Sequence, residues 1–504
     1  MAEMPEKEEQ AMANSFFGLH IGTSGLYAAN TWLNITANNI SNEQTKGYSR
    51  QTATQQASKA LRVYQRYGEI GSGVEVSDIT RVRDEYYDVK YWNNQCKYGD
   101  STTKAYYLMQ IEDYFADDGK SGFTTEFSGF YNSLDELSKT PADLSARSSM
   151  LNYAENFLEY MSTIKTNLQN TQADLNAEIY SNVDKINSLS KEIAIINKQI
   201  NVIELQGANA NELRDKRSLL VDELSSIVEV DTHEVFYENG KSEYYVTICG
   251  KSLVNNYDCF TLETKAREEK ADEDDLVGLY DIKWSYGEDF DPAASGTRGT
   301  LSALILLRDG NNSVAEAGNP VAEKVDFKGI PYYIDEIDKF LDKFTETINE
   351  VHAKGVNLYD EPTTDIQFFI QDKSGKYIVN PEIMEDPMKL ATSTYGTAEI
   401  SASDIVDELV NTKNYKNFDG GTAKEALNTI ITELSIDSKK AQSQEKNYTN
   451  FQKLIQNQRL SIMGVDKDEE AMNLVKYQEA YDLSAKVIQI MSEIYDKLIN
   501  ETGL

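Results

Sequence analysis

The residues best suited to metal binding or nucleophilic chemistry are few in this chain of 504 residues. They are His20, His233, His352, Cys96, Cys249 and Cys259. His233 and Glu234 begin a zinc-protease motif, HExxH, but Tyr237 stands where the second histidine is needed. A tyrosine cannot supply the second imidazole, and the alternating pattern around it predicts a strand, whereas the motif requires a helix. This segment is therefore not expected to bind zinc.

The remaining candidates form no chemical group either. His352 lies near the end of an expected helix and is interpreted as a packing or capping residue, and His20 has no ligand-type companion nearby. The odd number of cysteines and the absence of CxxC argue against a disulfide framework or a zinc module, although Cys249 and Cys259 could lie on neighbouring strands. The phosphate-binding, dinucleotide and nucleophile-elbow motifs are absent. We predict no catalytic, cofactor or metal site.

The charge balance argues against nucleic acids and membrane surfaces as partners. The chain carries 49 basic and 83 acidic side chains, a net charge of -34. Such a chain is repelled by nucleic acid and by anionic membrane surfaces. Six of the eight residues from 268 to 275 are acidic. A calcium loop would also need ordered oxygen ligands and a sharp glycine turn, so a solvated loop is expected there. No stretch is apolar enough to span a membrane, and the acidic start MAEMPEKEEQ is unlike a signal peptide.

The elements that would position any site are dominated by apolar repeats at the two ends of the chain. Near the N-terminus, residues three and four apart form the series Leu19, Gly22, Leu26, Ala29, Leu33, Thr36 and Ile40. Near the C-terminus the same spacing gives Leu474, Tyr477, Tyr481, Ser484, Ile488, Met491, Tyr495 and Leu498. This is the spacing of a coiled-coil seam. Because neither helix can bury its own stripe, we predict that the two ends pack on each other and on further chains. The alternative is two amphipathic helices buried in one globular core.

The segment between the two ends is also predicted to be largely helical. Apolar residues at near-heptad spacing predict one continuous helix over 150–205, about 80 Å long at 1.5 Å per residue. Further helices are predicted over 209–227, 334–351 and 436–462. Alternating residues around Asn239-Gly240 predict a β-hairpin within 228–248, and 276–286 reads as another strand. The fold class is therefore mainly α with inserted β, in an elongated helical bundle.

Two terminal segments resemble a known family. Asn38-Asn39-Ile40-Ser41-Asn42, followed by Thr45, Gly47, Tyr48 and Arg50, is similar to the N-terminal motif of the flagellar rod, hook and hook-associated proteins. The run DEEAMNLVKYQEAY from residue 468 resembles the C-terminal helix of the same family. Within the central region, 306–309 and 337–355 also resemble its hook-associated members. Residues 1–11 precede Met12, where relatives would begin, and are either an acidic extension or a start-codon artefact.

The resemblance implies a structural protein without enzymatic activity or cofactor. It would be exported through the flagellar type III apparatus without signal-peptide cleavage and would lie outside the cell, at the junction of hook and filament. Its partners would be further copies of itself, the hook protein, a second junction hook-associated protein and an export chaperone, with no nucleic acid or membrane. The expected assembly interface consists of Leu19, Leu26, Leu33, Asn38, Asn39, Ile40, Asn42, Gly47, Tyr48, Leu474, Tyr477, Gln478, Tyr481, Ile488, Met491, Tyr495 and Leu498.

The same resemblance leaves alternative functions open and suggests how the chain is divided into domains. A hook or distal-rod subunit would share the N-terminal motif, although such proteins usually lack the DEEAMNLVKYQEAY run. An adhesin on the same scaffold would use the β-region, and an enzyme domain in the middle is the least expected reading. The predicted domains are 12–60 with 465–504 as the terminal assembly domain, 61–227 with 301–355 and 436–464 as the bundle, 228–300 as a β-rich insertion, and 356–435 as a mixed outer region.

Overall fold

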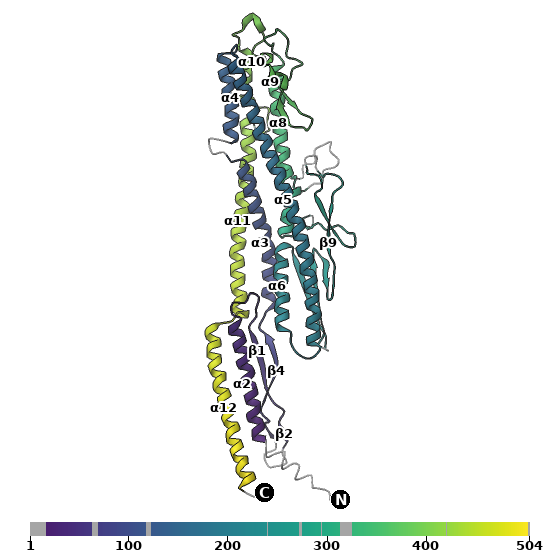
Figure 1. Ribbon diagram of the computed structural model, residues 1–504, viewed down its shortest axis with the longest axis vertical. Helices are drawn as coiled ribbons and strands as arrows, with labels where there is room; N and C mark the ends of the chain where they lie inside the picture. Colours follow the sequence, from purple (N-terminus) through teal and green to yellow (C-terminus); the bar gives the residue numbers. More distant parts are fainter. Residues whose placement is uncertain are drawn as a thin grey trace.

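The computed structural model describes residues 17–62, 69–116, 122–238, 240–271, 275–293, 295–312, 325–419 and 421–501. The described chain is long and narrow, with a slender terminal unit below a larger helical body (Figure 1). Helix α2 (Phe17–Ser41) begins, and helix α12 (Lys467–Asn500) ends, at the far end of the terminal unit. The predicted mainly helical fold with inserted strands is confirmed. Residues 1–11, whose status the sequence left open, lie outside the described residues.

The terminal unit combines the two end helices with a β-hairpin. Helices α2 and α12 run antiparallel, and strand β1 (Gln51–Ala57) pairs antiparallel with β4 (Val74–Arg81) beside α2. Two short strands, β2 (Leu61–Arg62) and β3 (Glu69–Ile70), pair with each other. Strands β3 and β4 therefore lie with the terminal helices, beyond the boundary at residue 60 inferred from the sequence. Pairing with a distant strand moved this boundary, and such pairing leaves no local signal.

The body is built around helix α5 (Leu144–Glu204), which confirms the predicted continuous helix and spans about 90 Å. Its apolar stripe is buried along its length, and further helices complete the body. These are α3 (Glu85–Tyr114), α4 (Phe123–Lys139), α6 (Asn211–Ile227), α7 (Thr300–Asp309), α8 (Ile330–His352), α10 (Asp404–Asn411) and α11 (Ala423–Met463). Helix α11 begins earlier than predicted, at a capping box in which Thr422 and Glu425 bond reciprocally. The predicted helices over 209–227 and 334–351 are confirmed as α6 and α8.

The β-rich insertion covers one side of the body (Figure 1). A four-stranded antiparallel sheet contains β5 (Val230–Phe236), β6 (Ser242–Ile248), β7 (Lys251–Asn255) and β8 (Asp258–Cys259) in that order. The β5–β6 pairing confirms the predicted hairpin, with Gly240 in the turn at φ +80°, whereas Asn239 lies outside the described residues. Strand β9 (Leu262–Ala266) pairs with β10 (Tyr280–Trp284), which is shorter than the predicted strand over 276–286. All three cysteines are free.

The prediction that the acidic run 268–275 forms a solvated loop is wrong at Asp275, the last residue of the run. Asp275 is only 4% exposed and accepts a hydrogen bond from the Nε2 group of Gln172 on α5. A carboxylate that is removed from water needs such a donor. Residues 272–274 of the same run lie outside the described residues.

The upper end of the body contains the mixed region 356–435. Besides α10 and the start of α11, its elements are β11 (Phe369–Gln371), β12 (Tyr377–Val379), α9 (Pro381–Glu385) and three short 3-10 turns at Pro387–Lys389, Gly396–Glu399 and Thr412–Asn414. His352, at the end of α8, is fully buried, and its Nε2 accepts a hydrogen bond from the backbone N–H of Ala391. Burial lowers the pKa of His352 to about 4. It therefore packs as a neutral side chain, as interpreted from the sequence.

Candidate assembly interface

Helices α2 and α12 approach each other through glycines. A Cβ atom placed on Gly22 would lie 2.9 Å from the Cγ1 atom of Ile488, and one on Gly18 would lie 2.7 Å from the Sδ atom of Met491. Both distances are shorter than real Cβ contacts. A larger residue at Gly22 would force Ile488 to shift, whereas at Gly18 the flexible end of the Met491 side chain could move aside. Ile488 and Met491, two predicted seam residues, fill the space left by the missing side chains.

The contact continues along the helix pair. The rings of Trp32 and Tyr477 stack with centroids 4.9 Å apart, and Gly25 faces Ser484. Burial raises the pKa of the Tyr477 phenol. Tyr481 and Tyr495 are half-buried on the same side of α12. The predicted C-terminal seam is thus the side of α12 that meets α2.

The predicted apolar residues at the edges of this contact are only partly covered. On α2 the half-buried side chains are Leu19, Leu26, Leu33 and Ile40. On α12, Leu474 is 36% exposed, Leu498 is 44% exposed and Gln478 is exposed. In the isolated chain these residues keep apolar surface that a neighbouring molecule could bury.

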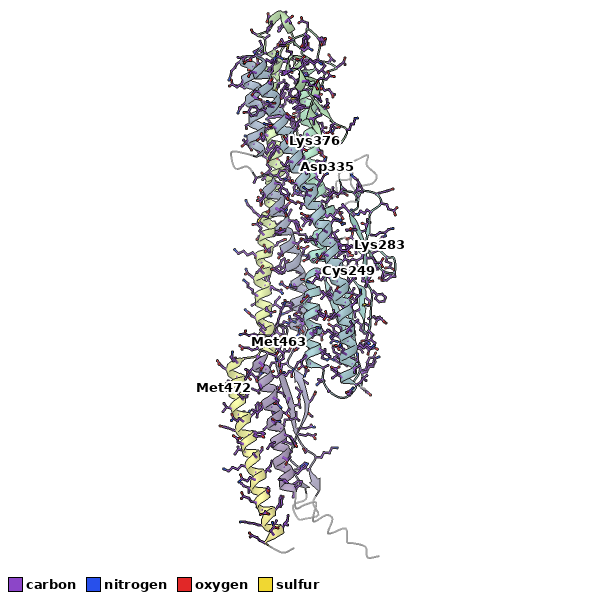
Figure 2. The ribbon with its side chains drawn as sticks, viewed as in Figure 1. Cys249, Lys283, Asp335, Lys376, Met463 and Met472 are labelled. Atoms are coloured by element: carbon purple, nitrogen blue, oxygen red, sulfur yellow. The ribbon has the colours of Figure 1, made fainter. Side chains whose placement is uncertain are left out.

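A second apolar face of α12 was not found from the sequence. We call it the outer stripe, and it consists of the exposed residues Met472, Val475, Leu483, Val487, Ile490 and Ile494. Figure 2 shows Met472 pointing away from the molecule at the top of α12. In this helix of 34 residues, Glu470 is the single buried residue. The helical spacing of the outer stripe was visible in the sequence, but the first seam already accounted for an amphipathic helix.

The asparagine motif at the end of α2 bonds within the chain. The side chain of Asn39, 1% exposed, donates to the backbone oxygen of Gln51 and accepts from its N–H, at 3.0 and 2.9 Å. The Tyr48 hydroxyl donates to Asn39, and Asn42 donates to Asn38. Burial is the main cause that raises the pKa of Tyr48. These polar groups shape the turn that leads from α2 into β1.

Gly47 makes that turn possible. Its φ of +85° is in the left-handed region that favours glycine, and a Cβ atom there would lie 3.3 Å from the side chain of Leu219 on α6. The tight reversal predicted from the sequence is present. The structure therefore places Gly47 against α6 of the body and joins Asn38, Asn39, Asn42 and Tyr48 to each other at the turn that follows α2. Of the predicted residues of α12, Tyr477, Tyr481, Ile488, Met491 and Tyr495 are half-buried on the side that faces α2.

Sequence reasoning missed the ion pairs that follow the turn. The Nε group of Arg50 donates to Glu470 at 2.7 Å, and its Nη2 group donates to Glu469 at 2.7 Å. Burial by itself would lower the pKa of Arg50, but these two carboxylates raise it. The pairs join residues more than 400 positions apart, so no local pattern could have revealed them.

Two further features of the described residues bear on function. They contain no group of three or more histidine, cysteine or acidic side chains that could hold a metal ion. Within the same ranges, none of the helices is both long and apolar enough to cross a membrane. The surface most suited to an interaction is the apolar face that α12 leaves uncovered.

The fold and this interface define a class: structural proteins whose paired terminal helices leave apolar surface for other molecules. Comparisons with known proteins agree on the family. Residues 108–369, more than half of the chain, match the flagellar hook-associated protein FlgK helical domain, and residues 456–501 match the C-terminal domain of flagellar basal body rod FlgEFG proteins.

Relatives match over nearly the whole chain. The chain is 28% identical to flagellar hook-associated protein 1 of Bacillus subtilis (strain 168), over 98% of this chain and 99% of the relative. It is 26% identical to flagellar hook-associated protein 1 of Escherichia coli (strain K12), over 95% and 98% of the two chains. The solved flagellar hook junction protein FlgK from Burkholderia pseudomallei is 20% identical with a TM-score of 0.44, over 54% of this chain and 45% of that one.

The chain belongs to the family of flagellar hook-associated protein 1 (FlgK), the hook–filament junction proteins. It is a structural component of the bacterial flagellum and not an enzyme. The resemblance inferred from the terminal motifs is confirmed.

Proposed function

We propose that copies of this chain polymerise through α2 and α12 to form the junction between hook and filament. The observation that carries the proposal is that α12 packs mainly on α2 and leaves the outer stripe exposed. An exposed apolar stripe of this extent on a helix marks an interaction surface. In an assembled tube, neighbouring copies would cover the stripe, so that ordering of the terminal helices is coupled to assembly.

The net charge favours association through a specific contact and opposes non-specific association. A charge of -34 makes copies repel each other at a distance. Association therefore requires a close apolar contact strong enough to overcome this repulsion. The terminal helices offer such a contact: α2 contains no acidic residue, and α12 exposes aliphatic side chains along its length.

The proposed partners follow from the position at a junction. The hook protein would contact one side of the ring of copies and a second junction hook-associated protein the other. Before export, a dedicated chaperone would cover the outer stripe of α12, because an uncovered apolar helix face promotes aggregation. The chain would be exported unfolded, without signal-peptide cleavage, and would act outside the cell.

A deletion strain tests the proposal. Cells that lack this chain should build hooks but release flagellin into the medium. Restoring the full chain should return filaments to the cells, whereas a chain that lacks residues 465–504 should not. A deletion strain that keeps normal filaments would refute the junction function, and full rescue by the truncated chain would refute assembly through α12.

A further inference from the structure

The terminal unit and the body meet at a joint that contains several buried hydrogen bonds and ion pairs. The chain crosses between the two parts twice, from Arg81 to Glu85 and from Met463 to Lys467. Figure 2 shows Met463 at this level, where α11 ends above α12. Two short covalent links by themselves would allow the parts to bend relative to each other, so any fixed angle must come from the contacts around them.

Asp215, on helix α6 of the body, is the centre of these contacts. Its carboxylate accepts hydrogen bonds from the backbone N–H of Ser49 at 2.8 Å, from the Ser49 hydroxyl at 2.7 Å, and from the Nη1 group of Arg81 at 2.9 Å. Ser49 is fully buried and Asp215 is 6% exposed. All three donors come from the terminal unit, so this carboxylate joins the turn that precedes β1, and strand β4, to the body.

The neighbouring residues hold the body side of the joint in place. Arg459 on α11 donates to Asp88 on α3 at 2.6 Å and to Asp222 on α6 at 2.7 Å. Arg83 also donates to Asp88, at 2.6 Å, and its Nη1 group donates to the Ser49 hydroxyl at 3.3 Å. One connected network therefore links three helices of the body to Ser49.

Helix α12 is tied to the same turn from the other side. The backbone N–H of Arg50 donates to the oxygen of Met463 at 2.8 Å, and its guanidinium binds Glu470, which is 2% exposed. Glu470, the single buried residue of α12, thus fixes the guanidinium of Arg50, whose backbone N–H reaches across the joint to the end of α11. Because a buried charge that loses its partner is strongly unfavourable, any bend at the joint would have to break several such contacts together.

We propose that Asp215 is a positioning residue that holds the terminal unit at one fixed angle to the body in each single chain. The turn that contains Ser49 and Arg50 is the part of the terminal unit that it recognises. Each subunit then presents its terminal helices in a preset direction before it meets another copy. This inference does not depend on the proposed polymerisation, because it concerns the isolated chain.

Pulsed electron spin resonance on the full chain tests the angle directly. Spin labels are attached at Ser77→Cys on β4 and Lys198→Cys on α5, both exposed, in a chain whose three native cysteines are replaced. The chain with Asp215 intact should give one narrow distance distribution. Asp215→Asn replaces an acceptor oxygen by an amide that faces the Ser49 and Arg81 donors, so the distribution should broaden at least about twofold.

Glu234→Gln is the matched control. Glu234, whose side chain is 12% exposed, is also a carboxylate that pairs with arginines, Arg214 and Arg217, but its network lies within the body. The control should keep the narrow distribution, and Ser49→Ala should broaden it less than Asp215→Asn. A narrow distribution in Asp215→Asn would overturn the proposal. Loss of the melting transition of the body in that variant would overturn it too, because Asp215 would then support the body itself.

Discussion

The substitution Ile490→Asp tests the role of the outer stripe in assembly while leaving the contact between α2 and α12 unchanged. Ile490 is 49% exposed, so about half of its side chain is still available for burial by a neighbouring copy. Complete burial of an isoleucine stabilises by roughly 1.5–3 kcal/mol, and the uncovered half is therefore worth about 1 kcal/mol. An aspartate enclosed there without a partner costs at least about 1 kcal/mol more. Each contact between subunits should weaken by about 2 kcal/mol, or roughly 30-fold.

The isolated chain should hardly respond to the same substitution. Surface changes of this kind shift stability by about 0.5 kcal/mol or less. Thermal unfolding of the purified Ile490→Asp chain should therefore match the unchanged chain, while cells that produce it should release flagellin. Ile195→Asp is the matched control, since Ile195 is 58% exposed on α5 of the body, outside the predicted interface. Ile488→Asp should change both thermal unfolding of the purified chain and release of flagellin by cells, because Ile488 faces Gly22 in the contact between α2 and α12.

The result that would refute this reasoning is a normal number of filaments on cells that produce Ile490→Asp. The outer stripe would then stay in water after assembly. A large fall in the melting temperature of the isolated chain would refute it differently, by showing that Ile490 supports the fold of the chain itself.

Three further predictions follow from the same structure. In a dilute solution of single chains, amide exchange in α12 should be much faster than in α5, because α12 buries one residue and α5 buries an apolar stripe; equal protection would contradict coupled ordering. Removing residues 465–504 should abolish binding of the export chaperone in a pull-down, and unchanged binding would place its site elsewhere. Because burial lowers the pKa of His352 from 6.5 to about 4, the unfolded chain takes up the proton first as pH falls. Stability should therefore fall between pH 6.5 and 4 by roughly 3 kcal/mol more than in His352→Gln, measured by urea unfolding, and parallel pH profiles would show that His352 is not buried as a neutral side chain.

Much of the fold was predictable because periodicity is a local property. The apolar stripes determine that α5, α6 and α8 are helices, and the turn at Gly240 between alternating runs determines the β5–β6 hairpin. The seam from Tyr477 to Tyr495 likewise indicates which side of α12 meets a partner helix. The terminal motifs were also sufficient to indicate the family.

Only the tertiary structure decided which distant residues meet. The sequence shows asparagines, Gly47 and Tyr48 as a motif, but not that the turn they form lies against helix α6 of the body. It shows Asp215 as one of many acidic residues, and nothing near it in the chain reveals that Ser49 and Arg81 fill its carboxylate. The physical reason is that hydrogen bonds and ion pairs act over a few ångströms in space, whereas a repeat in sequence reports only on neighbours within one element. The two ends of the chain carry the signal for pairing, and the folded body determines the angle at which the pair is held.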